Sequence, residues 1–202
     1  MKLAVSSWSP YQHQAQAFLQ LIDPHVIEMV PLEAHSMPIH DKAVGPFIVL
    51  LDETLEVPAL GLPCIAEVLH RRHPEYGLLP EDPVDRARTR AFSCMIEEQL
   101  SRFCVSGIKS HAHFDRPIWQ EGSAAPSVVL ESPPAFSALE RHCEAKETFT
   151  YLCADHPTIT DALMAALWWT IEDQSRLELL SDAPSLWRWH SRACQGSPFQ
   201  RA

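Results

Sequence analysis

The sequence predicts an α/β domain followed by an all-α domain, and three observations support this prediction. Short apolar runs alternate with helical periods as far as about residue 73. The stretch 73–83, HPEYGLLPEDP, then holds three prolines and a glycine, which is typical of a linker. Beyond it, every strong period is helical. We therefore expect the α/β domain at 1–75, a linker at 76–83 and the helical domain at 84–202.

Composition places the chain among globular proteins and excludes several function classes. Apolar residues make up 46% and charged residues 21% of the 202 residues, close to average values. The net charge of −10 argues against nucleic acid or an anionic membrane as a partner. No apolar run approaches the roughly eighteen residues of a membrane span. The apolar run near the start, Leu3 to Val5, is too short for a signal peptide, so we expect a cytoplasmic protein.

The first part of the chain reads as strand, helix, strand. We expect a strand over 2–6, a helix from Pro10 to about residue 22, and a second strand over 26–30. Ser9 suits the N-cap of this helix and Pro10 its first turn. The buried stripe of the helix is expected at Ala15, Phe18, Leu19 and Ile22.

The stretch 44–73 reads as strand, strand, helix. An apolar run at 47–51 stops at Asp52-Glu53, and a second run follows at 54–57, so a tight turn between two strands is expected. A helix follows from Pro63, with an apolar face that includes Ile65, Val68 and Leu69. Glu67 and Arg71 are spaced for an i, i+4 ion pair on its other face.

Helices account for the rest of the chain. A long helix is expected from Asp82-Pro83, with apolar positions at Ala87, Phe92, Met95, Ile96, Leu100 and Phe103. Another runs from Ala135 to about Cys153, and a strongly apolar one covers 162–171. Thr158 and Asp161 form a capping box before it, in which the Thr158 hydroxyl accepts from the Asp161 amide and the carboxylate reaches back to the Thr158 amide.

Cysteines and histidines give no metal or disulfide framework. The six cysteines are scattered without any C-x-x-C spacing, which favours reduced structural thiols; they are Cys64, Cys94, Cys104, Cys143, Cys153 and Cys194. Only His111 and His113 bring two imidazoles close together, and no third ligand is near. We therefore expect no bound metal, and we interpret both histidines as loop or cleft-lining residues.

Taken together, these motifs resemble the glutathione S-transferase superfamily over essentially the whole chain. The N-terminal half is similar to the thioredoxin-like domain of that family, and Ser9-Pro10-Tyr11 matches the start of its serine-type members. The helix after Thr158 is similar to the central helix of its all-α domain, and the final stretch, Pro184 to Phe199, to its last helix and ending. The resemblance implies a thioredoxin-like N-terminal domain, an all-helical C-terminal domain and a homodimer.

The resemblance also implies the chemistry. Transferases of this kind lower the pKa of bound glutathione, because the thiolate is the nucleophile, and Ser9 is the implied hydrogen-bond donor to it. An ordinary N-cap is the alternative role for Ser9. Pro46 corresponds to a proline, usually cis, that exposes the backbone of Gly45; an ordinary trans proline at a strand start is the alternative.

The glutathione site departs from the family pattern. Gly61-Leu62 stand where a Glu-Ser pair holds the γ-glutamyl group, Pro63 removes a further amide, and Gln14 replaces a basic residue. We expect glutathione, if it binds, to meet Gly45, Pro46, Gly61 and Leu62. The pocket for the electrophile is expected between the first turn and the long helix, lined by Trp8, Tyr11, Phe103, His111, His113 and Phe114; Phe103 has core packing as its alternative role.

Two function classes follow. The first is an enzyme that uses glutathione on a small hydrophobic electrophile. The second is a non-catalytic protein of the same fold that binds an apolar ligand or a protein, with weak or no affinity for glutathione. Fold alone does not choose between them, because function depends on the site.

Overall fold

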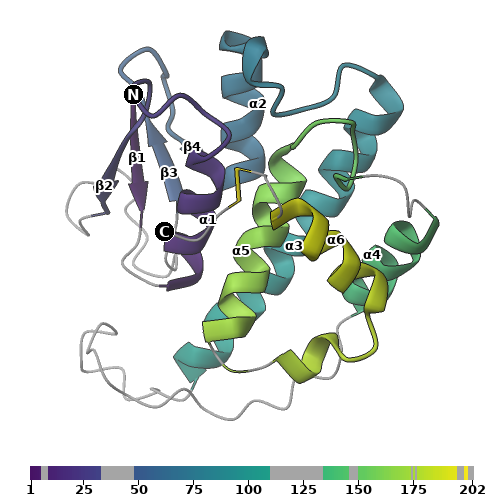
Figure 1. Ribbon diagram of the computed structural model, residues 1–202. Coiled ribbons are helices and arrows are strands. Elements are labelled where there is room, and N and C mark those ends of the chain that lie inside the picture. Colours follow the sequence, from purple (N-terminus) through teal and green to yellow (C-terminus); the bar gives the residue numbers. More distant parts are fainter. Residues whose placement is uncertain are drawn as a thin grey trace.

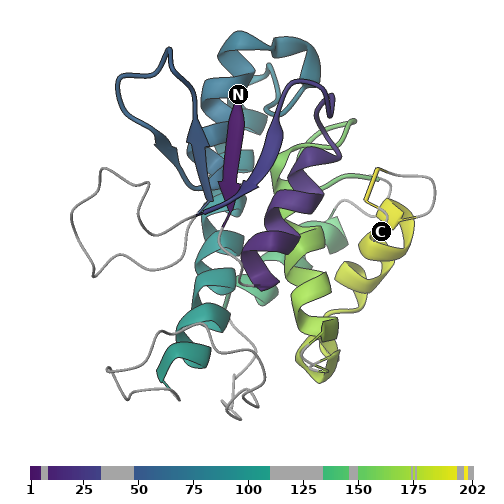
Figure 2. The same cartoon turned by 90° about the vertical axis from the view of Figure 1, so that its left-hand side faces the viewer.

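A small sheet and a group of helices lie side by side in the computed structural model (Figures 1 and 2). The structure describes residues 1–5, 9–32, 48–109, 134–145, 150–173, 175, 177–194 and 198–199. Helix α1 (Ser9–Leu19) lies between the sheet and helix α5 (Ile159–Asp173), so that the sheet and the helices share a continuous core. This arrangement confirms the fold class expected from the sequence.

Four strands form one mixed sheet in the order β2-β1-β3-β4. Central β1 pairs parallel with β2 and antiparallel with β3, and β4 is antiparallel to β3. The strands are β1 (Lys2–Val5), β2 (Glu28–Pro31), β3 (Ile48–Leu51) and β4 (Ala59–Leu60). The two central strands are almost entirely buried, as expected of apolar runs covered by helices.

The strand expected at 54–57 is wrong, because Asp52 ends β3 in a side-chain turn. Its carboxylate accepts hydrogen bonds from the amide of Thr54 at 2.8 Å and from the Thr54 hydroxyl at 2.7 Å. Arg72, the last residue of α2 (Leu62–Arg72), donates to both Asp52 and Thr54 and holds this turn in place. An Asp that bonds the backbone two residues on favours a turn over a strand. The chain therefore pairs with β3 only at Ala59–Leu60.

Two helices cover the sheet. These are α1 (Ser9–Leu19) and α2 (Leu62–Arg72), each confirmed within the usual uncertainty at helix ends. Ala15, Phe18 and Ile22 are buried as expected. The expected ion pair of Glu67 with Arg71 is replaced by a longer-range one. The Glu67 carboxylate accepts from Nε of Arg90 on α3 (Pro83–Lys109) at 2.5 Å.

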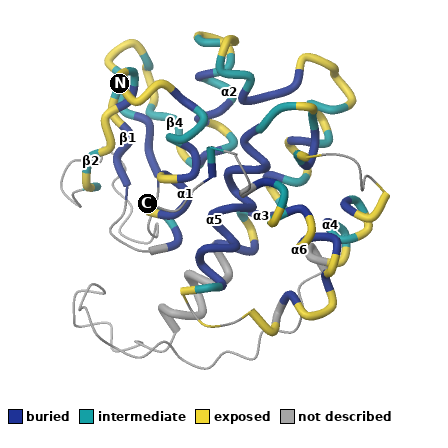
Figure 3. Tube along the Cα trace, viewed as in Figure 1, coloured by how far each residue is buried: buried dark blue, intermediate teal, exposed yellow. Residues whose placement is uncertain are grey.

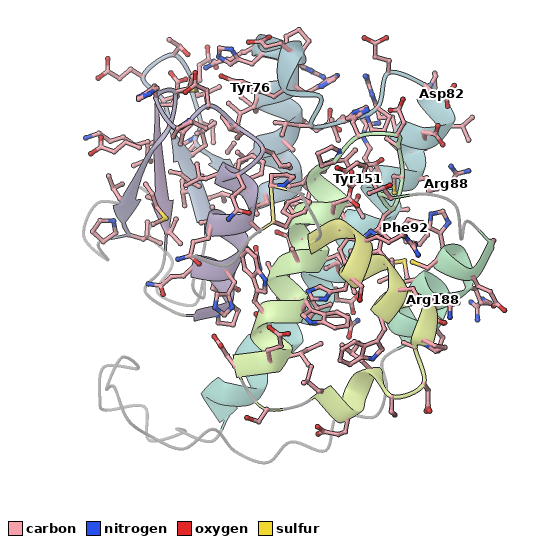
Figure 4. All side chains as sticks on the ribbon, in the orientation of Figure 1. Tyr76, Asp82, Arg88, Phe92, Tyr151 and Arg188 are labelled. Atoms are coloured by element: carbon pink, nitrogen blue, oxygen red, sulfur yellow. The ribbon has the colours of Figure 1, made fainter. Side chains whose placement is uncertain are left out.

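The helical part begins with α3 (Pro83–Lys109), whose first turn is capped by Asp82. Oδ1 of Asp82 accepts from the amides of Val84 and Asp85, both at 2.9 Å (Figure 4). Ile96 and Leu100 are buried as expected, whereas Ala87 is exposed.

Helix α4 (Pro134–Ala145) ends earlier than expected, and residues 150–156 form bends. Phe92 on α3 meets the His142 ring of α4 at 4.6 Å between centroids (Figure 4).

Helix α5 (Ile159–Asp173) is the centre of the molecule. Every residue from Ile159 to Ile171 is buried, which Figure 3 shows as a continuous dark blue segment. The central buried helix expected from its apolar sequence is thus confirmed. Trp168 is fully buried and stacks on His190 of α6 (Pro184–Cys194), with 4.0 Å between ring centroids. Short 3-10 turns occupy Pro74–Tyr76 and Leu177–Leu180.

The capping box before α5 is confirmed with one change. Oδ2 of Asp161 accepts from the Thr158 amide at 2.9 Å, as expected. The Thr158 hydroxyl, however, donates to Asp161 at 2.9 Å and does not accept from the amide of Asp161. Oδ1 of Asp161 also accepts from the amide of Leu152 at 2.8 Å, so this carboxylate joins the preceding bend to the helix. Among the described residues, no helix is long and apolar enough to span a membrane.

Candidate functional site

The ends of three elements meet at one end of the sheet, where β1 finishes and β3 begins. In the sheet register Val5, the last residue of β1, stands opposite Ile48, the first residue of β3. The carbonyl of Ile48 in turn accepts from the amide of Gly61 at 3.0 Å, directly before α2. Since α1 starts at Ser9, only a few residues beyond Val5, the N-termini of α1 and α2 lie at the same end of the sheet (Figure 1). Two helix N-termini at one end of the sheet form an electrostatically positive region.

Ser9 is the first residue of α1, so the helix starts one residue earlier than the start at Pro10 with Ser9 as N-cap that the sequence predicts. Its side chain and the whole of Trp8 lie outside the described part of the chain. Tyr11, also in the first turn, is half-buried and packs against the main core. Gln14 is only 1% exposed, so it lies inside the molecule and does not extend into the solvent at the site.

Several expected site residues cannot be placed. Gly45 and Pro46 lie outside the described residues, as do His111, His113 and Phe114. Phe103 belongs to α3, but its side chain is not described. The glutathione contacts at Gly45 and Pro46 and the pocket for the electrophile therefore stay predictions.

Gly61 and Leu62 provide backbone only. Gly61 has a φ of +76°, a backbone conformation that residues other than glycine rarely adopt. It therefore lets the chain turn from β4 into α2. Leu62 is the first residue of α2 and its side chain is fully buried in the core. Any ligand at this helix end would therefore meet backbone and no side chain of this pair, and the N–H of Gly61 is already bonded to Ile48. Pro63, the next residue, has no N–H to offer.

Glu97, which the sequence reading did not single out, reaches this same helix end from α3. Its Oε1 would stand 3.0 Å from a Cβ placed on Gly61, so the glycine leaves room for the carboxylate. Burial raises the pKa of Glu97, and the nearby backbone N–H of Leu62 acts in the opposite direction. A signal was present in the sequence: Glu97 is an acid directly next to the buried position Ile96.

Cys64, in the first turn of α2, does not have the properties of a thiolate nucleophile. A cysteine at a helix N-terminus often has a lowered pKa. Here burial raises the pKa of the Cys64 thiol, and the nearby Glu97, Cys94 and Glu67 raise it further. The described part of the site thus holds no activated protein thiol, and within the same residues no cluster of side chains suits a metal ion.

Comparison with solved structures identifies the fold. A glutathione S-transferase from Methylobacterium radiotolerans, in complex with glutathione sulfonate, matches with a TM-score of 0.66 and 17% identity, over 98% of this chain and 92% of the other. A glutathione S-transferase from Methylobacillus flagellatus with glutathione bound matches with a TM-score of 0.65 and 18% identity, over 98% and 96%. A maleylacetoacetate isomerase from Anaeromyxobacter dehalogenans matches with a TM-score of 0.59 and 20% identity, over 98% and 89%.

No family model matches the sequence, and a search of curated proteins gives no match either. The structural similarity nevertheless extends over nearly the whole chain in each case. The chain therefore has the glutathione S-transferase fold, which confirms the resemblance drawn from its motifs at the level of fold. At identities of 15 to 20% the similarity leaves the activity and the substrate to be argued from the site.

Proposed function

We propose that this protein, which has the glutathione S-transferase fold, uses glutathione or a related small thiol in a reaction with a small hydrophobic electrophile. One observation supports the proposal: α1, which begins at Ser9, and α2 have their N-termini at the same end of the sheet. A thiolate at this end of the sheet is stabilised by the positive N-termini of both helices. Solved structures of the same fold hold glutathione or glutathione sulfonate.

In this proposal Ser9 donates a hydrogen bond to the thiolate sulfur. The bond favours the ionised thiol and so increases the fraction of nucleophile near neutral pH. The thiolate then attacks the electrophile, forming a carbon–sulfur bond, and the displaced electron pair leaves with the leaving group or is protonated by solvent. Gly45 and Pro46 would meet the peptide backbone of the thiol, and Tyr11, with Trp8 and Phe103, would line the pocket of the electrophile.

The experiment is a calorimetric titration with glutathione, combined with the ultraviolet absorption of the bound thiolate. Ser9→Ala is expected to lower the thiolate signal and the conjugation rate by about tenfold to a hundredfold, the value of one hydrogen bond to a charged group. Ser137→Ala, an exposed serine on α4, is the matched control and is expected to behave like the wild type. No binding at millimolar glutathione, or equal behaviour of Ser9→Ala and the wild type, would contradict the proposal.

A second candidate is a non-catalytic protein of this fold that binds an apolar ligand or another protein. It is favoured by the helix end at Gly61-Leu62-Pro63, which offers no side-chain hydroxyl and one N–H fewer than usual. Binding of a hydrophobic ligand that is unchanged in Ser9→Ala, without any affinity for thiols, would select this candidate.

We also propose a cytoplasmic homodimer built from an α/β domain at 1–75, a linker at 76–83 and a helical domain at 84–202. The glutathione S-transferase fold and the cysteine pattern support this organisation. Sedimentation equilibrium at micromolar concentration checks it, since a monomer would contradict the proposed dimer.

A further inference from the structure

Two contacts set the register between α2 and the first half of α3. Nε of Arg90 on α3 donates to the Glu67 carboxylate on α2 at 2.5 Å. Further along α3, Oε1 of Glu97 lies 3.0 Å from the position that a Cβ of Gly61 would take, directly before α2. A later residue of α3 thus meets an earlier residue on the side of α2, so the two helices run antiparallel where they meet.

Cys64 and Cys94 lie between these two contacts. Cys64 is three residues from each of the two contact residues on its side, and Cys94 is four and three residues from those on α3. Residues three or four apart are neighbours on one face of a helix. The two cysteines therefore stand in facing turns of α2 and α3. In agreement, Cys94 is near enough to Cys64 to contribute to the raised pKa of its thiol.

Both thiols of this pair reach the solvent. Cys64 and Cys94 are exposed, whereas Cys143 and Cys153 are buried. A small disulfide in solution can therefore reach the exposed pair, and a second thiol beside a mixed disulfide converts it into an internal disulfide. The raised pKa of Cys64 makes its thiolate a poor leaving group, which protects an internal disulfide once it has formed.

We propose that Cys64 and Cys94 form a dithiol site that a low-molecular-weight disulfide oxidises to a covalent bond between α2 and α3. This site is independent of the proposed use of glutathione. A disulfide in a reducing compartment is typically transient and senses the redox state. The bond proposed here ties the start of α2 to the helical part of the chain.

The reaction takes place in two exchange steps. The thiolate of Cys94 attacks one sulfur of the small disulfide, forms a mixed disulfide and releases one small thiolate. The thiolate of Cys64 then attacks the Cys94 sulfur, forms the internal disulfide and releases the second small thiolate. The two protons from the cysteines go to the two small thiolates. The protein pair thus loses two electrons and the small disulfide gains them.

The test treats the native protein with bis(2-hydroxyethyl) disulfide, a neutral oxidant that does not resemble glutathione. Free thiols are then alkylated, and the protein is digested with trypsin for mass spectrometry. Cleavage after Lys and Arg places each of the six cysteines in a peptide of its own. We expect the peptides of Cys64 and Cys94 to be joined, with a mass lower by two hydrogen atoms, while Cys143 and Cys153 stay reduced.

The matched control moves one thiol along α3. Cys94→Ser/Ala87→Cys keeps an exposed thiol on this helix but places it seven residues earlier, outside the segment between the two contacts. It is expected to give at least about tenfold less of the joined peptide, because two thiols react quickly only when they are held together. Equal yields from this variant and the native protein would overturn the inference, as would mixed disulfides on both cysteines without a joined peptide.

A second measurement needs no oxidant. Dibromobimane becomes strongly fluorescent only when two neighbouring thiols have displaced both of its bromides. The native protein is expected to become fluorescent, and Cys64→Ser and Cys94→Ser are each expected to lose most of this signal. Equal fluorescence of the native protein and both variants would show that other thiols capture the reagent and would overturn the inference.

Discussion

The imidazole of His13 on α1 is held by Asp173 at the end of α5, with 3.0 Å between Nε2 and Oδ2. On its other side Nδ1 lies 3.2 Å from the hydroxyl of Thr170. That hydroxyl donates to the carbonyl of Ala166 at 2.7 Å, so it accepts from His13. The ring also makes an edge contact with Trp169, at 6.1 Å between centroids. This buried histidine fixes α1, and with it the first turn at Ser9, against the central helix.

Replacing His13 is expected to destabilise the protein more than replacing its ionic partner. His13→Ala removes a buried side chain and is expected to lower the free energy of unfolding by about 2 kcal/mol. Asp173→Asn is expected to cost less than about 1 kcal/mol, because pairs that reach the solvent contribute little and the Asp173 side chain is 36% exposed. Urea denaturation of the two variants measures both values. Equal losses would mean that the ion pair, and not the packing of the ring, joins the helices.

Asp161 is expected to matter more than an exposed helix cap. Its carboxylate is fully buried and accepts from the amides of Leu152 and Thr158 and from the Thr158 hydroxyl. Asp161→Ala leaves these donors buried without an acceptor and is expected to cost about 3 kcal/mol, against about 1 kcal/mol for an ordinary cap. Denaturant midpoints give this difference, and a loss near that of an ordinary cap would show that water replaces the carboxylate.

The same carboxylate gives stability a defined pH dependence. Burial raises the pKa of Asp161 to about 6 from an ordinary value of 3.8, against the effect of its hydrogen bonds. The folded state therefore binds this proton more tightly than the unfolded chain, and the stability it contributes is lost as pH rises from about 4 through about 6. When the pH is lowered from about 7.5 to about 5, the free energy of unfolding of the wild type is expected to rise by about 1 kcal/mol relative to that of Asp161→Ala. A difference between the two proteins that does not change with pH would contradict this.

The four thiols whose side chains the structure describes are expected to separate into two groups in alkylation. Cys64 and Cys94 are exposed, whereas Cys143 and Cys153 are buried. Burial raises the pKa of Cys143 to about 12 and that of Cys153 to about 11, so their thiolate fraction near neutral pH is very small. In the native protein these two should react at least about a hundredfold more slowly than Cys94, as measured by peptide mass spectrometry. In denaturant the difference should disappear, which serves as the control.

Elements that depend on neighbouring residues in the chain were predictable from the sequence. The apolar stripe of α1, the proline in the first turn of α2 and the capping box before α5 all rest on contacts within four residues. The fold class followed from the same local signals, because the order of strands and helices limits how they pack. The strand at 54–57 was predicted wrongly because Asp52 bonds the backbone of Thr54 in a local turn, and Arg72 on α2, a contact the local signals do not show, holds that turn in place.

The sequence by itself thus determined the order of the helices and the central strands, and the site at the start of α1 stays a prediction. Tertiary structure alone decided which charged side chains meet: Glu67 with Arg90, and His13 with Asp173. The physical reason is that hydrogen bonds within a helix depend on residues three or four apart. The partner of a side chain on another element depends instead on how the elements pack, and that packing brings the Glu97 carboxylate of α3 next to Gly61, before α2.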